Sequence, residues 1–239
     1  MPFGVRTEPV ADGVWLVRGG LPVRNMNVYL LEDEGGLTVF DAGIEAMAEG
    51  IAEEAAKLGG IKRVLLSHSH ADHRGAAAGL GRPVLCHPAE VADAEGDGGM
   101  HYLDFSKIRL PPARWLYPSL LRHWDGGPVK VAGTVSEGDE VADFTVLHFP
   151  GHAPGLIGLW RERDRLALVS DVLYTLNPET GRFLKEPHLP HPTFTPNREQ
   201  ARASLRKLAA LEPRSVWPGH ANPVIGDVRT RLEEAAETT

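Results

Sequence analysis

Short apolar runs separated by turn residues make up the first forty positions of the chain. Their spacing and their content of β-branched residues predict antiparallel strands. These strands are expected at 13–17, 27–31 and 36–40. The pattern then changes, because Ile51, Ala55 and Leu58 recur at helical spacing while charged residues occupy the other positions. This predicts an amphipathic helix over 45–58 that ends at Gly59 and Gly60.

Strands and helices alternate through most of the remaining chain. Buried strands are expected over 63–66 and 83–86, with short helices after them near 76–80 and 88–95. In the second half we expect strands near 140–149, 156–161, 165–170 and 215–217, helices over 197–210 and 227–236, and a proline-rich loop over 177–196. Strands followed by helices, twice over, predict an α/β (α+β) fold in which two sheets pack face to face with helices outside.

The segment 96–135 does not follow this alternation. Glycines and prolines bracket an aromatic and arginine-rich run, and we interpret the segment as an insertion over the core. Trp115, Tyr117 and Arg122 within it are candidate substrate contacts. Two interpretations stay open, a lid over a binding site and a packing or dimer-forming surface. No linker or repeat divides the chain, so we expect one domain over 1–239.

Composition and charge exclude several classes of protein. The chain has 239 residues, of which 42% are hydrophobic and 24% charged, as in ordinary globular domains. The formal net charge is -7 and the basic residues are scattered, so no nucleic-acid-binding surface is indicated. The N-terminus lacks the pattern of a secretory signal, and no apolar run is long enough to cross a membrane. With Cys86 as the only cysteine, we expect a cytoplasmic protein without an intrachain disulfide, a monomer or homodimer that acts on a small molecule.

Three histidines and one aspartate stand within six residues, His68-x-His70-x-Asp72-His73, at the end of the strand expected over 63–66. Packing so many imidazoles together is unfavourable unless something satisfies their ring nitrogens. A divalent cation does so, because it binds neutral imidazole and ionised carboxylate at once. The alternative is a solvated polar turn, but such a turn does not require three histidines and an aspartate. The motif therefore predicts a metal site.

Three further segments each place a histidine or an aspartate directly after an expected strand. They carry His152 in Pro150-Gly151-His152, Asp171 in Ser170-Asp171, and His220 in Pro218-Gly219-His220. A Gly-His pair after a strand is weak evidence when taken alone, because a capping or hydrogen-bonded loop histidine explains it equally well. Taken with the cluster, the three segments are the expected remainder of the site.

These motifs resemble those of the metallo-β-lactamase superfamily, in which a His-x-His-x-Asp-His cluster is followed by a distant His, an Asp and a final His. The resemblance covers nearly the whole chain, from Asp41-Ala42-Gly43 to Pro218-Gly219-His220. It implies an αββα sandwich with the metal site at one edge between the two sheets. The ligands that it implies are His68, His70 and His152 for one metal, Asp72, His73 and His220 for the second, and Asp171 as the bridge.

The chemistry of such a site is hydrolytic, because two divalent cations that share a water lower its pKa towards about 7. We expect a hydrolase with two Zn²⁺ ions, or Mn²⁺ or Fe, that acts on an ester, lactone, thioester or amide bond. Asp72 and Tyr174 are the candidate catalytic residues. The Asp-x-x-Tyr spacing from Asp171 to Tyr174 is similar to that of lactonases of the superfamily, and a buried core tyrosine is the alternative. Asp41 is expected to accept a hydrogen bond from a metal-bound imidazole, or else to organise the turn before Gly43.

Two other functions stay open. The sequence is also similar to mononuclear iron persulfide dioxygenases, which share the fold and the first motif. In that case the iron ligands would be His68, His152 and Asp171. A non-catalytic binding protein could keep the fold, although all seven candidate ligands are present in this sequence. Metal content separates the first alternative from the hydrolase, since two zinc ions favour the hydrolase and one iron with oxygen consumption favours the dioxygenase. Among hydrolases, Tyr174 and the chain size favour a lactonase or other esterase over a glyoxalase II-like thioesterase, which would carry a longer C-terminal extension.

Overall fold

The computed structural model describes residues 5–20 and 24–237, so Met1–Gly4 of the N-terminal segment considered above lie outside the described residues. Two mixed β-sheets face each other. The first has, in spatial order, β1 (Arg6–Ala11), β2 (Val14–Gly19), β3 (Met26–Asp33), β4 (Gly36–Phe40), β5 (Ile61–Leu65), β6 (Val84–Cys86) and β7 (Val131–Thr134). Its strands are antiparallel from β1 to β4 and parallel from β4 to β7. The parallel part is where the metal-site motif begins.

The second sheet is mostly antiparallel. Its strands, in spatial order, are β15 (Val224–Ile225), β14 (Ser215–Pro218), β11 (Leu166–Ser170), β10 (Ile157–Arg161), β9 (Phe144–His148) and β8 (Glu140–Val141). Only the pair β11 and β14 is parallel. A separate hairpin consists of β12 (Tyr174–Asn177) and β13 (Arg182–His188). The mixed sheets flanked by helices confirm the predicted fold class.

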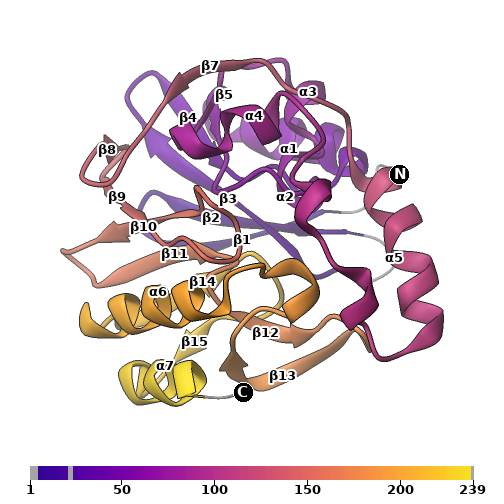
Figure 1. Ribbon diagram of the computed structural model, residues 1–239. Coiled ribbons are helices and arrows are strands. Elements are labelled where there is room, and N and C mark those ends of the chain that lie inside the picture. The colour runs from indigo at the N-terminus through magenta and orange to yellow at the C-terminus, as the bar shows by residue number, and fades with distance from the viewer. Residues whose placement is uncertain (1–4, 21–23, 238–239) are drawn as a thin grey trace.

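Helices cover the outer faces of both sheets (Figure 1). On the side of the first sheet are η1 (Glu45–Met47), α1 (Ala48–Lys57), α2 (Ala71–Arg74), α3 (Ala77–Leu80), η2 (Pro88–Glu90), α4 (Val91–Ala94), η3 (Met100–Tyr102), η4 (Phe105–Lys107) and α5 (Pro111–Trp124). On the other side are α6 (Arg198–Ala210) and α7 (Val228–Glu237), whereas η5 (Pro192–Phe194) packs Phe194 into the helix-side core of the first sheet. In Figure 1, α6 and α7 lie together below the second sheet, in orange and yellow.

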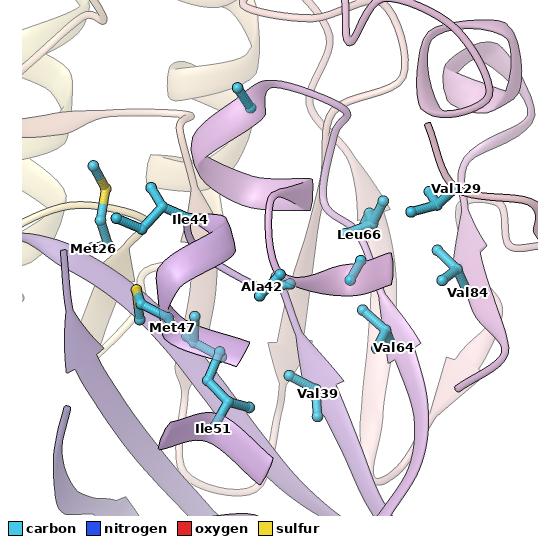
Figure 2. Packing of buried hydrophobic residues seen from close by; sticks show 14 of the residues in the cluster. Met26, Val39, Ala42, Ile44, Met47, Ile51, Val64, Leu66, Val84 and Val129 are labelled. Atoms are coloured by element: carbon cyan, nitrogen blue, oxygen red, sulfur yellow. The ribbon is translucent and has the colours of Figure 1, made fainter. Parts of the chain in front are cut away.

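Alternation along the strands explains why three separate cores form. In β3, Val28 and Leu30 pack under the helices while Tyr29 and Leu31 face the second sheet. Successive side chains of a strand point to opposite faces, so a strand buried on both sides must be apolar throughout. Figure 2 shows the core on the helix side, where Ile51 lies near Val39 and where Val64 and Val84 continue the apolar face on the next two strands. Burying each such side chain stabilises the fold by about 1.5–3 kcal/mol.

Two sequence predictions need correction. The segment 177–196 is not a plain loop, because β13 pairs with β12 inside it; Pro187 and the polar positions of Arg182–His188 hid this exposed strand. The segment 96–135 is not a pure insertion, because β7 hydrogen-bonds to β6 in the first sheet. It also contains the helix α5, which its prolines concealed, although proline is tolerated in the first turn of a helix. The prediction of one domain over 1–239 stays a prediction.

A buried arginine fastens α5 to the metal-site segment. The guanidinium of Arg74, next to His73 in sequence, donates two hydrogen bonds to Asp125, with Nε–Oδ1 and Nη2–Oδ2 distances of 3.0 and 2.7 Å. Its Nη1 donates to the carbonyl oxygens of residues 93, 94 and 96. Such a bidentate pair fixes orientation as well as distance. The end of α5 is thereby held beside the loop that carries the candidate ligands. No helix in the described residues is long and apolar enough to cross a membrane.

Candidate metal centre

Four loops that follow strands carry the seven predicted ligands to one edge of the sheets. The loop after β5 and the start of α2 hold the His68–His73 cluster, and the loop after β9 holds His152. Asp171 directly follows β11, and His220 follows β14. These strand ends lie together because β11 and β14 are parallel and because the backbone of Ile157 in β10 donates to Ser67 of the first sheet's loop. The structure thus brings all seven residues together.

Three imidazoles form one half of the cluster. Nδ1 of His70 lies 3.1 Å from Nε2 of His68 and 3.0 Å from Nε2 of His152, and all three rings are buried. Burial lowers the pKa of His70 to about 3 and that of His152 to about 4. It also places the pKa of His68 well below its usual value. These rings are therefore neutral near pH 7, and one nitrogen of each lies close enough to the other two to share an ion.

The other half combines histidine with carboxylate. Nε2 of His220 lies 3.3 Å from Nε2 of His73 and 3.4 Å from Oδ2 of Asp72. Burial acts to lower the pKa of both histidines, but the neighbouring carboxylates, Asp171 first, raise the pKa of His220 to about 9 and that of His73 well above its usual value. Burial acts to raise the pKa of Asp72, and His73 and His220 lower it to about 2. This half is thus strongly polar.

Asp171 stands between the two halves. Its Oδ1 lies 3.4 Å from Nε2 of both His73 and His220. Its Oδ2 lies 3.5 Å from Nε2 of His152 and accepts a hydrogen bond from the Tyr174 hydroxyl at 2.9 Å. One carboxylate therefore turns an oxygen towards each half, as the predicted bridging role requires.

The residues present fit a pair of divalent cations. In the described part of the chain, the buried Oδ1 of Asp171 has no hydrogen-bond partner, which is costly for a carboxylate that nothing else satisfies. Gly219 keeps the space beside it open, because a Cβ at that position would lie 2.6 Å from Asp171 Oδ1 and 2.6 Å from His73 Cε1. Imidazole nitrogen and carboxylate oxygen are ligands that zinc and related cations accept. Within this cluster, three sets of donor atoms lie close enough to share an ion: His68, His70 and His152; His68, His73 and Asp171; Asp72, His73 and His220.

Asp41 lies behind the ligands. Its Oδ2 is 2.9 Å from Nδ1 of His73, and its Oδ1 accepts from the backbone N–H of Ser67 at 2.8 Å. The hydroxyls of Ser67 and Ser170 also lie within hydrogen-bonding distance of Oδ2. A carboxylate that accepts from Nδ1 leaves the Nε2 lone pair of His73 directed into the cluster. The residue takes a left-handed backbone conformation, with φ of 60°.

Glu90 and Thr195 are among the supporting residues that the sequence analysis missed. The buried carboxylate of Glu90 accepts from the backbone N–H of Ser69 at 2.9 Å and from that of Gly155 at 2.7 Å. It thereby connects the loop of His68 and His70 with the loop of His152. The hydroxyl of Thr195 lies 3.3 Å from Nδ1 of His152. Neither residue stands in a motif, so no signal in the sequence distinguishes it from an ordinary surface position.

The last ligand loop depends on the first sheet. The side-chain amide of Asn27 in β3 donates to the carbonyl oxygens of Pro218 and Ala221, at 2.9 and 3.1 Å. The hydroxyl of Tyr29 donates to the same Pro218 carbonyl at 2.7 Å. His220 lies between these anchored residues, so its position is determined by a strand almost two hundred residues earlier in the chain.

A cavity opens onto the cluster and separates the predicted substrate residues. Its lining includes, besides Asp72, Asp171, Tyr174 and His220, the side chains of Met26, Leu103, Tyr117, Leu121, Trp124 and Phe194. Tyr117 is half-buried and donates a hydrogen bond to the Pro178 carbonyl at 2.7 Å. Trp115 is 83% exposed, Arg122 is also exposed, and neither lines this cavity. Both point away because they occupy the outer face of α5.

Comparisons of the sequence and of the structure with known proteins agree with each other. The family model of the metallo-beta-lactamase superfamily matches residues 21–220. The probable metallo-hydrolase YflN of Bacillus subtilis is 30% identical, over 91% of this chain and 89% of its own. The hydroxyacylglutathione hydrolase GloC of Haemophilus influenzae is 27% identical, over 60% of this chain and 64% of its own. The solved structure of TTHA1623 in a di-iron-bound form superposes with a TM-score of 0.65 at 25% identity, over 91% of this chain and 97% of that one.

Proposed function

The chain belongs to the metallo-beta-lactamase superfamily, and we propose that within it the chain is a dinuclear metal-dependent hydrolase of small molecules. The bond that it breaks is an ester, lactone, thioester or amide bond. The observation that carries this proposal is the place of Asp171, whose two oxygens face the two halves of the cluster. The names of YflN and GloC as hydrolases support the reaction class.

Each half of the cluster would hold one divalent cation, with His68, His70 and His152 on one side and Asp72, His73 and His220 on the other. When bound, such cations lower the pKa of water and polarise the oxygen of a carbonyl group. Zn²⁺ is the cation we favour for both halves, since neutral imidazoles and carboxylates suit it. Mn²⁺ and Fe accept the same ligands, and the di-iron form of TTHA1623 makes iron a specific alternative.

Tyr174 would donate its hydroxyl hydrogen to the substrate. It lines the cavity, and in the free protein it donates to Oδ2 of Asp171. Burial, helped by the charge of Asp171, raises its pKa well above the usual value, so the hydroxyl stays protonated near pH 7. A buried donor aimed at an oxygen that gains negative charge stabilises the transition state. We infer that Tyr174 turns from Asp171 to the carbonyl oxygen of the bound substrate.

The apolar wall of the cavity would take up the non-reacting part of the substrate. Tyr117, Leu121 and Trp124 of α5 supply much of this wall. Because these residues come from the segment 96–135, we propose that the segment contacts substrate and excludes water from the site. This choice favours the lid over the interface among the two interpretations of the segment.

The test is the metal content of protein purified without added metal, followed by turnover of a panel of lactone, ester, thioester and β-lactam substrates. We expect about two cations per chain and hydrolysis of at least one class. Asp72→Ala and His73→Ala should each remove one cation and most of the turnover, whereas Asp12→Ala, at an exposed turn carboxylate, should change neither. Near-normal turnover in the first two variants with both cations retained would refute the proposal. One iron per chain with oxygen consumption would instead support the dioxygenase, whose ligands would be His68, His152 and Asp171.

A further inference from the structure

A groove with an excess of positive charge lies beside the metal-site cavity. Lys107, Arg109 and Arg198 line it, with Glu179 as the only carboxylate among its lining residues in the described chain. Pro178 lines both the groove and the cavity. The groove and the cavity therefore lie next to each other at this residue. The groove differs in sign from the chain as a whole, whose formal net charge is -7.

The one carboxylate of the groove is already occupied. Glu179 accepts hydrogen bonds from the backbone N–H groups of Arg109 and Leu110, each at 3.0 Å. Nε2 of His191 lies 3.0 Å from the same carboxylate, while its Nδ1 accepts from the backbone of Thr193. Burial acts to raise the pKa of Glu179, and these donors lower it. The negative charge thus fastens the hairpin β12–β13 to the segment before α5 and leaves the arginines unpaired.

The cationic side chains remain available to a ligand. Among the described residues, Arg109 and Arg198 form no ion pair, and Arg198 makes one hydrogen bond, from Nη1 to the Pro190 carbonyl at 3.1 Å. Lys107 faces Asp104 at 3.6 Å, but both side chains are about half exposed, so this contact is weak. Burial lowers the pKa of His191, Glu179 acts to raise it, and the charges of Arg198 and Arg109 act to lower it further.

We propose that this groove binds an anionic group, a carboxylate or a phosphate, that the substrate carries at the end remote from the bond to be broken. The inference rests on the proposed function, because it assumes that the reacting bond lies at the metal cluster. Guanidinium groups recognise both anions by paired hydrogen bonds, so they define the charge of the tail and leave its exact chemistry open. The substrate class is therefore an acyl compound with an apolar middle and a charged end.

The test uses the full-length, metal-loaded protein and thioesters whose tail ends in a methyl, a carboxylate or a phosphate group. Two series of these three compounds are needed. In one series the tail belongs to the acyl group, and in the other it belongs to the leaving thiol. In at least one series the charged end should lower KM by about tenfold relative to the methyl end, as expected for hydrogen bonds to a charged group. Arg109→Gln and Arg198→Gln should remove most of this preference and leave kcat/KM for the methyl-ended compound unchanged. Arg82→Gln is the matched control, because Arg82 is an exposed arginine that lies just before β6 and does not line the groove.

Equal KM for charged and methyl ends, or a preference that survives both groove variants, would overturn the inference. The carboxylate and phosphate arms identify which anion is preferred. If no thioester is hydrolysed, the proposed function fails for this class, and calorimetric binding of hydrolysis-resistant thioethers with the same ends then decides the inference alone. Arg109→Gln and Arg198→Gln should weaken binding of the charged thioethers by about tenfold, and unchanged binding would contradict the proposal.

Discussion

The two halves of the cluster use opposite electrostatic conditions to present ligands to a cation. His68, His70 and His152 are kept neutral by burial, which lowers their pKa values. His73 and His220 lie among carboxylates that raise their pKa values in spite of burial. The first half therefore offers the lone pairs of neutral imidazoles. The second half offers negatively charged carboxylates, and its histidines must each give up a proton before they bind metal. Asp171 is the residue that the two halves share.

The supporting residues divide along the same line. Asp41 holds His73 of the carboxylate half from behind, and Glu90 ties together the two loops of the imidazole half. Each is a buried carboxylate that accepts from two or more donors. Because each half of the cluster has its own supporting carboxylate, a single substitution can weaken metal binding in one half and leave the other intact.

Removing the shared residue should have the largest effect. In Asp171→Asn one carboxylate oxygen is replaced by an NH₂ group, which cannot act as a ligand, so one half loses its bridging oxygen and the site loses a negative charge. We expect the metal content to fall from about two cations to one or fewer and turnover to fall on the order of 10³-fold, measured by elemental analysis and initial rates. Asp164→Asn, at the other end of β11 and paired with Arg161, should retain both cations. Retention of two cations by Asp171→Asn would show that the carboxylate does not bridge.

Asp41→Asn should weaken the carboxylate half selectively. Asparagine tolerates the left-handed backbone at this position, but an NH₂ group in place of Oδ2 would face the Nδ1–H of His73. We expect the affinity for the second cation to fall by about 10–100-fold and that for the first to change little, measured by competition with a chelator. Asp33→Asn, at the far end of β3 and hydrogen-bonded to Thr38 and Arg63, is the control for losing a comparable carboxylate. Equal weakening of both cations would contradict the division into halves.

Glu90→Gln should weaken the imidazole half instead. Each carboxylate oxygen accepts from one backbone N–H, so a glutamine must turn its own NH₂ group towards either Ser69 or Gly155. We expect the first cation to bind about tenfold more weakly, with a smaller change for the second, in the same chelator titration. Glu95→Gln, whose carboxylate accepts from the backbone of Val131 outside the site, should bind both cations normally. A selective loss of the second cation would reverse our assignment of Glu90.

The smallest effect is expected from Thr195→Val, which removes the hydroxyl 3.3 Å from Nδ1 of His152. A hydrogen bond contributes about 0.5–1.5 kcal/mol, and a long one lies near the lower end of this range, so the first cation should bind several-fold more weakly at most. Thr193→Val is the matched control, because its buried hydroxyl has no partner among the described residues. Metal affinity equal to that of Thr193→Val would mean that Thr195 does not orient the imidazole.

How far the sequence could predict the molecule depended on the distance between interacting residues. The cluster from His68 to His73 is compact, and the loops of His152 and His220 carry a Pro-Gly-His or Gly-His signature after apolar strands, so these residues could be found without a structure. The central strands of both sheets could be predicted for the same reason, because burial on two faces leaves continuous apolar runs. The strands β1, β7 and β15 are less buried or very short and were not expected. The helix α5 and the strand β13 could not, because prolines and exposed polar positions interrupt their patterns.

Local sequence was sufficient for residue types that have few other uses, such as crowded histidines at the end of a strand. It was insufficient for Glu90, Thr195, Ser170 and the choice of Tyr117 over Trp115, because their roles arise from contacts across long stretches of chain. The Ser170 hydroxyl meets Asp41 from 129 residues away, and Thr195 meets His152 from 43. Sheet pairing and the crossing of α5 over the site create those contacts. A hydrogen bond leaves no periodic trace in sequence, so folding alone selects which ordinary polar residue supports the site.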